Sequence, residues 1–279
     1  MYLGAITWIA LLASIGQLDA RVYLNVSQFD SHRGYHVVVR GFKAMAYDPR
    51  GKVLGSATAR SITVGERAFW YLTPGADDLC SISFSGAVAR KCVSPPKHPG
   101  EMSGLKFFGG GVYFFVDSFR RVQGRVGHYY DLIRMDEATH ELHAVSRDHF
   151  FSGVPRWCLG DGLEYMYLND ASAGVGGVKK FTLPGEDRMN VFLPESCAVN
   201  GHDVAVADST HLIVNGQMTS IPASGLVFPF KDGWLVQTGS GFKLYSSGGH
   251  EMESGSMESP LMLYYDSDKF FLLNFGRHT

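Results

Sequence analysis

Short runs of residues ended by turn formers are the feature that most constrains the fold of this chain. From His36 onward, apolar or alternating segments are repeatedly closed by Gly, Pro, Asp or Asn. Apolar spacing of three and four positions, which is typical of an amphipathic helix, is almost absent. The 33 glycines and 13% aromatic residues suit tight turns between short strands with large cross-strand side chains. The sequence therefore predicts an all-β fold.

The hairpin pattern is clearest in the C-terminal third. Residues 203–221, 234–252 and 261–275 each run as a strand, a short polar turn and a second strand. Asn215-Gly216 is the strongest turn signal, because both central positions of a type I′ turn require a positive φ. These segments predict consecutive antiparallel hairpins.

Repeating units begin at intervals of about 30 to 50 residues, a spacing in the range of propeller repeats. Their starts lie near His36, Ala68, Val112, Glu164, Asp203, Trp234 and Leu261. Roughly twenty short strands are too many for one ordinary sandwich. Over residues 35–279 the chain therefore resembles the β-propellers, without the Trp-Asp, kelch or Asp-box signature of a particular family.

This resemblance implies a β-propeller of about six blades, with five to seven as the range, formed by residues 21–279 as one domain. The last unit supplies only two strands, so we expect residues 22–26 to complete its sheet. The alternative is two packed β-sandwich domains divided near the Pro-rich residues 95–100. We interpret that stretch as a connection between blades.

Residues 1–20 have the layout of a signal peptide. Residues 2–16 are nearly all apolar, and Ala20 offers a small residue before Arg21. The alternative is a membrane anchor, but about 15 apolar residues would span only ~22 Å of helix, short of a ~30 Å hydrocarbon core. We therefore expect a secreted protein with no membrane span after cleavage.

Secretion makes disulfides the expected state of the four cysteines. Cys80 and Cys92 lie symmetrically about Gly86, so a hairpin turning there would place them opposite one another. Cys158 and Cys197 are then left for each other. The alternative is four buried thiols in a reducing compartment. The sequon Asn25-Val26-Ser27 predicts a glycan on Asn25.

Charge and motif patterns exclude several kinds of partner. Lys and Arg number 25 against 27 Asp and Glu, and this balance gives no electrostatic reason to expect nucleic acid or an anionic membrane. No zinc-type spacing accompanies the cysteines, so we expect no metal and no cofactor. The charged segment 136–143 contains His140 and His143, and we interpret it as a solvated hairpin turn rather than a metal site.

The candidate ligand contacts are Arg156, Trp157 and Asp161, in a segment (155–162) that we expect to be a loop. Recognition concentrates on loops of a rigid scaffold. Trp157 would stack on a sugar face while Arg156 and Asp161 bond its hydroxyls. The alternative is that Trp157 packs against a disulfide at Cys158.

No catalytic residue is marked by spacing or motif. Nucleophile-elbow, phosphate-loop and zinc-protease motifs are absent from the sequence. Seven carboxylates qualify by type alone for a glycosidase pair: Asp117, Asp131, Asp161, Glu164, Asp203, Asp232 and Asp266. We therefore expect a secreted binding protein that recognises a glycan or an extracellular protein surface through propeller loops. The alternative is a secreted glycoside hydrolase, or a related hydrolase, with carboxylates in the propeller channel.

Overall fold

The structure is a computed structural model that describes most of residues 19–275. The ranges outside the description are 1–18, 76–77, 86–90, 94–100, 151–155, 161–162, 169–176, 183–184, 190–195, 201–202, 208–209, 216, 224, 239–240, 257–260 and 276–279. For the strands between residues 156 and 197, the backbone is described and the side chains are not.

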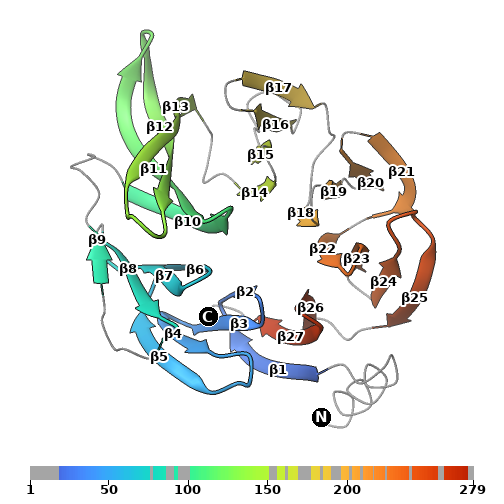
Figure 1. Ribbon diagram of the computed structural model, residues 1–279. Helices are drawn as coiled ribbons and strands as arrows, with labels where there is room; N and C mark the ends of the chain where they lie inside the picture. The colour runs from blue at the N-terminus through green and yellow to red at the C-terminus, as the bar shows by residue number, and fades with distance from the viewer. Residues whose placement is uncertain are drawn as a thin grey trace.

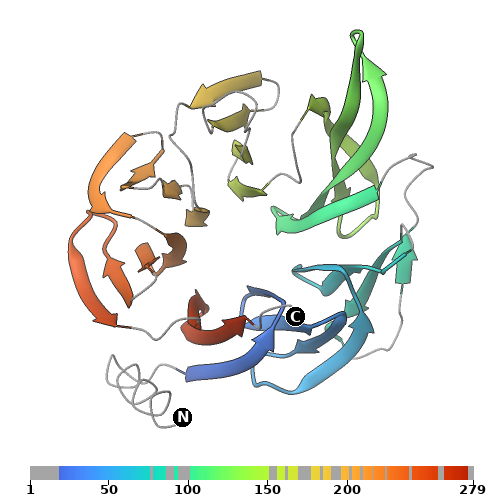
Figure 2. The ribbon, with the colours of Figure 1, turned by 180° about the vertical axis from the view of Figure 1, so that it is seen from behind.

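Seven sheets form a ring, and we number them as blades in chain order (Figures 1 and 2). Blade 1 contains β2 (Gln28–His32), β3 (Tyr35–Arg40), β4 (Lys43–Tyr47) and β5 (Val53–Thr58). Blade 2 contains β6 (Ser61–Val64), β7 (Ala68–Leu72), β8 (Leu79–Ser83) and β9 (Lys91–Val93). Blade 3 contains β10 (Glu101–Phe108), β11 (Gly111–Val122), β12 (Arg125–Asp136) and β13 (Leu142–Phe150).

The second half of the chain repeats this arrangement. Blade 4 contains β14 (Arg156–Gly160), β15 (Leu163–Leu168), β16 (Gly177–Thr182) and β17 (Gly185–Met189). Blade 5 contains β18 (Ser196–Asn200), β19 (Asp203–Ala207), β20 (His211–Val214) and β21 (Gln217–Pro222). Blade 6 contains β22 (Leu226–Phe230), β23 (Gly233–Thr238), β24 (Gly241–Tyr245) and β25 (Glu251–Ser256). Blade 7 contains β26 (Leu261–Asp266), β27 (Lys269–Phe275) and β1 (Asp19–Val26).

The two ends of the described chain meet in blade 7. Strand β1 pairs in parallel with β27, from Asp19 opposite Lys269 to Val26 opposite Phe275. The expected completion of the last sheet by residues 22–26 is therefore confirmed, and the strand begins a little earlier. This pairing joins the first and last described strands in one sheet and so closes the ring. Seven blades lie at the upper end of the predicted range, and the ring replaces the alternative of two sandwiches.

The hydrophobic core lies between neighbouring blades. Buried Trp70 and Leu72 of blade 2 pack with Met102 and Phe114 of blade 3. Similar buried clusters join blades 1 and 2, blades 5 and 6, blades 6 and 7, and blades 7 and 1. In these five pairs of blades one sheet therefore covers the face of the next, which is how a propeller buries short strands.

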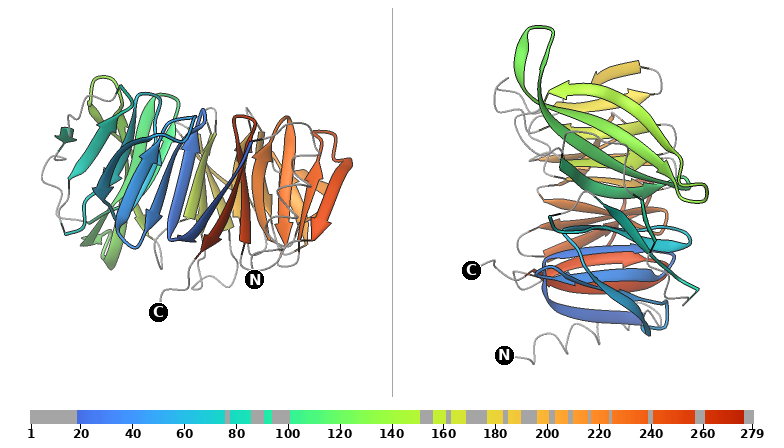
Figure 3. Two further views of the ribbon diagram at one scale, coloured as in Figure 1. Left: turned by 90° about the horizontal axis from the view of Figure 1, so that it is seen from below. Right: turned by 90° about the vertical axis from the view of Figure 1, so that its left-hand side faces the viewer.

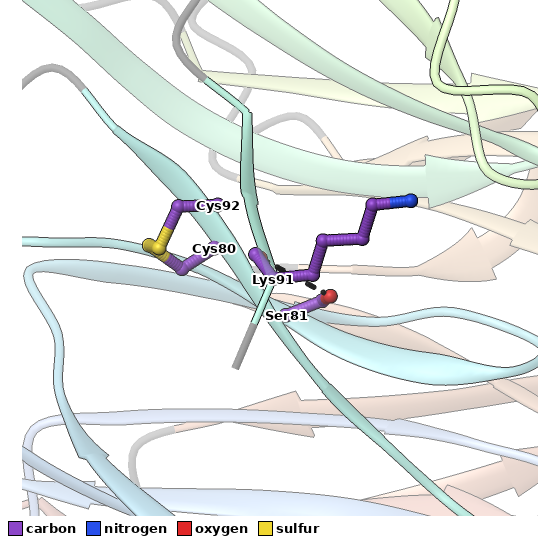
Figure 4. The surroundings of a disulfide bond; sticks show 4 residues. All are labelled: Cys80, Ser81, Lys91 and Cys92. Atoms are coloured by element: carbon purple, nitrogen blue, oxygen red, sulfur yellow. Dashed lines mark hydrogen bonds between the residues drawn. A yellow bond between two sulfur atoms is a disulfide. The ribbon is translucent and has the colours of Figure 1, made fainter. Parts of the chain in front are cut away.

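The first disulfide prediction is confirmed. Cys80 of β8 lies opposite Cys92 of β9, and the two are bonded, with Cα atoms 4.0 Å apart (Figure 4). The neighbouring pair is also joined, since the Ser81 hydroxyl donates to the carbonyl of Lys91. The bond ties the outermost strand of blade 2 to the rest of its sheet. Cys158 and Cys197 have side chains outside the described residues, so their pairing stays a prediction.

Peptide mapping without reduction tests both pairs. We expect one proteolytic fragment that joins Cys80 to Cys92 and another that joins Cys158 to Cys197. We expect the Cys158–Cys197 fragment because disulfides form in the oxidising secretory pathway and these are the two remaining cysteines. Free thiols at all four positions in protein purified without a reducing agent would contradict the expected secretion.

No helix among the described residues is long and apolar enough to cross a bilayer.

Candidate functional site

The innermost strand of each blade faces the axis of the ring (Figure 1). In blade 1 all five residues of β2 are half-buried, whereas the next strand, β3, has four buried residues out of six. The residues of β2 are therefore partly exposed at the axis, although the hydroxyl oxygen of Ser31 and the Nε2 atom of His32 are buried.

Asp30 is the central charged group of this region. Its Oδ2 accepts hydrogen bonds from the Thr63 hydroxyl and the backbone N–H of Val64, both at 2.8 Å, so it links β2 to β6. Its Oδ1 accepts from the backbone N–H of Ser31 at 3.0 Å. Burial raises the pKa of Asp30, and the nearby Lys106 ammonium offsets part of this rise.

His32 follows Asp30 by two residues on the same face of β2, and its ring contacts that of Phe107. Their ring centroids are 5.3 Å apart, which brings the end of β2 against the end of β10. The Nε2 atom of His32 is buried and has no hydrogen-bond partner among the described residues. A buried nitrogen of this kind costs free energy unless water or a ligand satisfies it. We call Asp30, His32, Thr63, Lys106 and Phe107 the axial site.

An aromatic wall borders the other side of β2. The Tyr264 ring lies 5.1 Å from that of Phe29 and 5.6 Å from that of Phe228, both in edge-on contact. Burial and the neighbouring carboxylates of Asp30 and Asp266 raise the pKa of Tyr264, so its phenol is neutral at physiological pH.

The predicted ligand residues lie elsewhere in the ring. Arg156 and Trp157 lie on β14, an innermost strand that pairs with β15, so the expected loop is wrong at these positions. Gly160 pairs with Leu163, and an Asp-Gly pair between them is a strong signal for a two-residue hairpin turn. Asp161 lies outside the described residues, as do the side chains of Arg156 and Trp157.

Arg156 and Trp157 are at the opposite end of the innermost strands from the axial site. Every blade starts with its innermost strand, so these strands run in one direction around the axis. Trp157 is near the start of β14, whereas His32 and Phe107 are near the ends of β2 and β10. The structure does not bring Arg156 or Trp157 to the axial site, and Asp161 lies outside the described residues.

The described carboxylates considered for hydrolysis do not converge. Each contacts a group on its own blade or a neighbouring turn: Asp117 with His128, Asp131 with Arg120, Asp203 with Asn215, Asp232 with Ser247, and Asp266 with the N–H of Gly34. Among the described residues, no three His, Cys, Asp or Glu side chains are grouped to hold a metal ion. Asp161 and the Glu164 side chain lie outside the description.

The turn predicted at residues 136–140 is confirmed, with one correction. Asp136 accepts hydrogen bonds from the backbone of Ala138 and Thr139, and these bonds lower its pKa. His140 adopts a positive φ and its ring lies edge-on to Trp70. Glu137, however, is only 7% exposed, so the turn is not solvated throughout.

Asn25 is exposed near the end of β1. It has a φ of 56°, at the point where the register of β1 against β27 shifts. The hydroxyl of Ser27 donates to the carbonyls of Val39 and Gly41. Because the Asn25 side chain is exposed, it can carry a glycan without disturbing buried residues. The modification stays a prediction.

The chain is similar to solved structures of several unrelated activities. It aligns with apo AztD from Citrobacter koseri at a TM-score of 0.55 and 12% identity, covering 81% of this chain and 70% of the other. For the acylaminoacyl peptidase of Pyrococcus horikoshii the TM-score is 0.61 at 8% identity, covering 87% of this chain and 48% of the peptidase. For the WD40 domain of Neurospora crassa Pan2 it is 0.57 at 10% identity, covering 87% and 82%.

No known protein family and no curated protein matches the sequence. The chain spans about half the length of the peptidase. Sequence identities this low show a shared fold and no shared activity. The ring of seven sheets and these similarities define the chain as a β-propeller protein, of a fold that hosts many functions.

Proposed function

We propose that this protein is a secreted binding protein that recognises a glycan at the axial site. The observation that carries the proposal is the buried, unpartnered Nε2 of His32 beside the ring of Phe107, within the described residues. Sugar hydroxyls both donate and accept hydrogen bonds, and sugar faces are apolar. The imidazole of His32 in contact with the Phe107 ring, together with the Lys106 ammonium near Asp30, matches both properties.

Binding is favoured over hydrolysis by the state of the carboxyl groups. A glycosidase needs two carboxyls about 5 to 9.5 Å apart. Within the described residues, Asp30 is the carboxyl of the axial site, and three hydrogen-bond donors already occupy it. Burial raises the pKa of Asp30, and this direction is the observation that favours a hydrolase instead, because a general acid needs a raised carboxyl pKa.

The secreted state is supported by three features of different kinds. Residues 1–20 have the composition of a signal peptide, Cys80 and Cys92 are bonded, and the sequon residue Asn25 is exposed. Arg156 and Trp157, at the start of the innermost strand of blade 4, are proposed as a second sugar contact, and Asp161, which follows the last residue of that strand, is proposed as a contact in its own right. The test of Arg156 and Trp157 is separate, because these two residues lie at the other end of the axis from the axial site.

A glycan array, with a panel of chromogenic glycosides beside it, tests the proposal. We expect saturable binding of a defined glycan class and no turnover of any glycoside. Turnover would replace the binding proposal with the hydrolase, and Asp30→Asn would then be the first variant to assay. Silence in both assays would overturn glycan recognition and leave a protein partner as the remaining class.

A further inference from the structure

Strand β1, which closes the propeller, buries little apolar surface. It lies beside β27, where the two ends of the described chain meet (Figures 1 and 3). Of residues 21–26, only Val26 is buried, whereas Val22 is 37% exposed and Leu24 is 43% exposed. Segments with few buried apolar contacts open most easily in local unfolding. The hold of β1 on the propeller therefore depends strongly on its hydrogen bonds.

Two side chains of β1 form hydrogen bonds with blade 1. The Tyr23 hydroxyl donates to Nε2 of His36, which lies on β3, at 2.6 Å. The Arg21 guanidinium donates to the carbonyl of Pro49, in the turn between β4 and β5, at 2.8 Å. Arg21 also acts electrostatically on the imidazole of His36. A change of charge on His36 would therefore act on both contacts.

His36 is enclosed at the contact between blades 7 and 1. The residue is 1% exposed, and its imidazole stacks on the ring of Tyr47 and contacts that of Phe271, both at 5.0 Å. Its Nδ1–H donates to the carbonyl of Gly34 at 3.2 Å, so Nε2 accepts from Tyr23. Burial lowers the pKa of His36 to about 4. The imidazole of the closed propeller is therefore neutral at physiological pH.

The charged groups that face His36 come from the three strands of blade 7. Arg21 of β1 and Lys269 of β27 lower the pKa of His36, whereas Asp266 of β26 raises it. From β2 the imidazole meets the ring of Phe29, at 6.3 Å. A proton on His36 would therefore add a third positive charge to a group that contains one carboxylate.

We propose that His36 is an acid-sensitive switch of propeller closure, whose protonation releases β1 while the other blades stay folded. A protonated imidazole carries a hydrogen on both nitrogens, so Nε2 no longer accepts from the Tyr23 hydroxyl. The new charge also repels the guanidinium of Arg21, which β1 carries. Release of β1 removes Tyr23 from the imidazole and lets water reach the cation. This switch does not depend on glycan binding.

The direction of the switch follows from proton uptake. His36 has a pKa of about 4 in the closed propeller, and release of β1 returns it toward the ordinary value of 6.5. Between these pH values the opened form binds a proton that the closed form does not, so acid favours opening. From pH 7 to pH 5 the equilibrium constant for release of β1 should rise about tenfold or more.

Amide hydrogen exchange of the intact protein at pH 7 and pH 5 tests the switch. Each rate is divided by that of an unstructured chain at the same pH, because intrinsic exchange also slows in acid. We expect the protection of residues 21–25 to fall about tenfold or more at pH 5, while that of β23 changes less than about threefold. His36→Gln should abolish the fall in β1. His143→Gln, at a ring that is 58% exposed, should retain it.

Tyr23→Phe provides a second test if His36→Gln does not fold. It removes the hydroxyl that donates to Nε2, so β1 should already be about threefold or more less protected at pH 7 and should change less on acidification. Three results would overturn the proposal: equal protection of β1 at both pH values, an acid-induced fall that persists in full in His36→Gln or Tyr23→Phe, and a loss of protection in all blades together, which is global unfolding.

Discussion

Glu137→Gln is expected to lower the free energy of unfolding by about 3 kcal/mol. The carboxylate of Glu137 accepts hydrogen bonds from the backbone N–H groups of Glu66 and Arg67 and from the Trp70 indole, at 3.0 to 3.2 Å. Both carboxylate oxygens are used, so an amide would turn its NH2 toward an N–H donor. The variant therefore loses one hydrogen bond and places two N–H donors against each other in the buried contact between blades 2 and 3.

Urea unfolding at neutral pH measures this loss. Glu141→Gln is the matched control, because the Glu141 side chain is 71% exposed in the same turn and should change stability by less than about 0.5 kcal/mol. Gly65→Ala gives an independent check, because a Cβ at Gly65 would overlap the Oε1 atom of Glu137. Equal stability of Glu137→Gln and Glu141→Gln would show that the hydrogen bonds of Glu137 between blades 2 and 3 contribute nothing to the free energy of unfolding.

Acidification is expected to cost about 3 kcal/mol of stability through His36 alone. Burial lowers the pKa of His36 to about 4, and the ring is 1% exposed. Its Nδ1–H donates to the carbonyl of Gly34 and its Nε2 accepts from the Tyr23 hydroxyl at 2.6 Å, which is the arrangement of a neutral imidazole. Tyr23 belongs to β1, so His36 supports the closure of the ring.

The sign follows from proton uptake. Between pH 6.5 and about 4 the unfolded chain binds a proton at His36 that the folded chain does not, so unfolding is favoured as the pH falls. The stabilisation is fully present above pH 6.5 and is lost as the pH falls toward 4. Arg21 and Lys269 add to the lowering of this pKa, and Asp266 opposes it.

The measurement is the free energy of unfolding at pH 7 and at pH 4.5, compared between the natural chain and His36→Gln. The difference between the two proteins should shrink as the pH falls, because His36→Gln has no proton to gain. His143→Gln, at a ring that is 58% exposed, should follow the natural chain. A constant difference across this range would contradict the buried neutral imidazole. The other titrating groups are the same in the natural chain and in His36→Gln, so their contributions cancel in the difference between the two free energies.

Hairpin turns and apolar strands made the fold predictable from sequence. Six of the seven predicted unit starts fall at the second strand of a blade, and the seventh, Leu261, is the first residue of β26. Several innermost strands, such as β2, β10 and β14, were not predicted. The reason is that these strands border the axis, so their residues alternate between polar and apolar contacts and lack a buried run, as Asp30, Ser31 and His32 show in β2.

The axial site could not be predicted from sequence. Asp30 and Lys106 belong to blades 1 and 3, and no local motif connects them. Glu137 was equally hidden, because the N–H groups it accepts from lie about 70 residues upstream. In contrast, Cys80 and Cys92 were predictable because a single hairpin sets their distance.

The most direct test of the account is titration of the glycan selected by the array against axial-site variants. We expect Lys106→Ala and His32→Ala each to weaken binding about tenfold or more, because each removes a polar group of the axial site. Lys52→Ala, at an exposed turn residue of blade 1, should bind as the natural chain does. Unchanged affinity in both axial variants would contradict glycan recognition at the axial site, and a loss confined to Trp157→Ala would move the ligand to the opposite end of the axis.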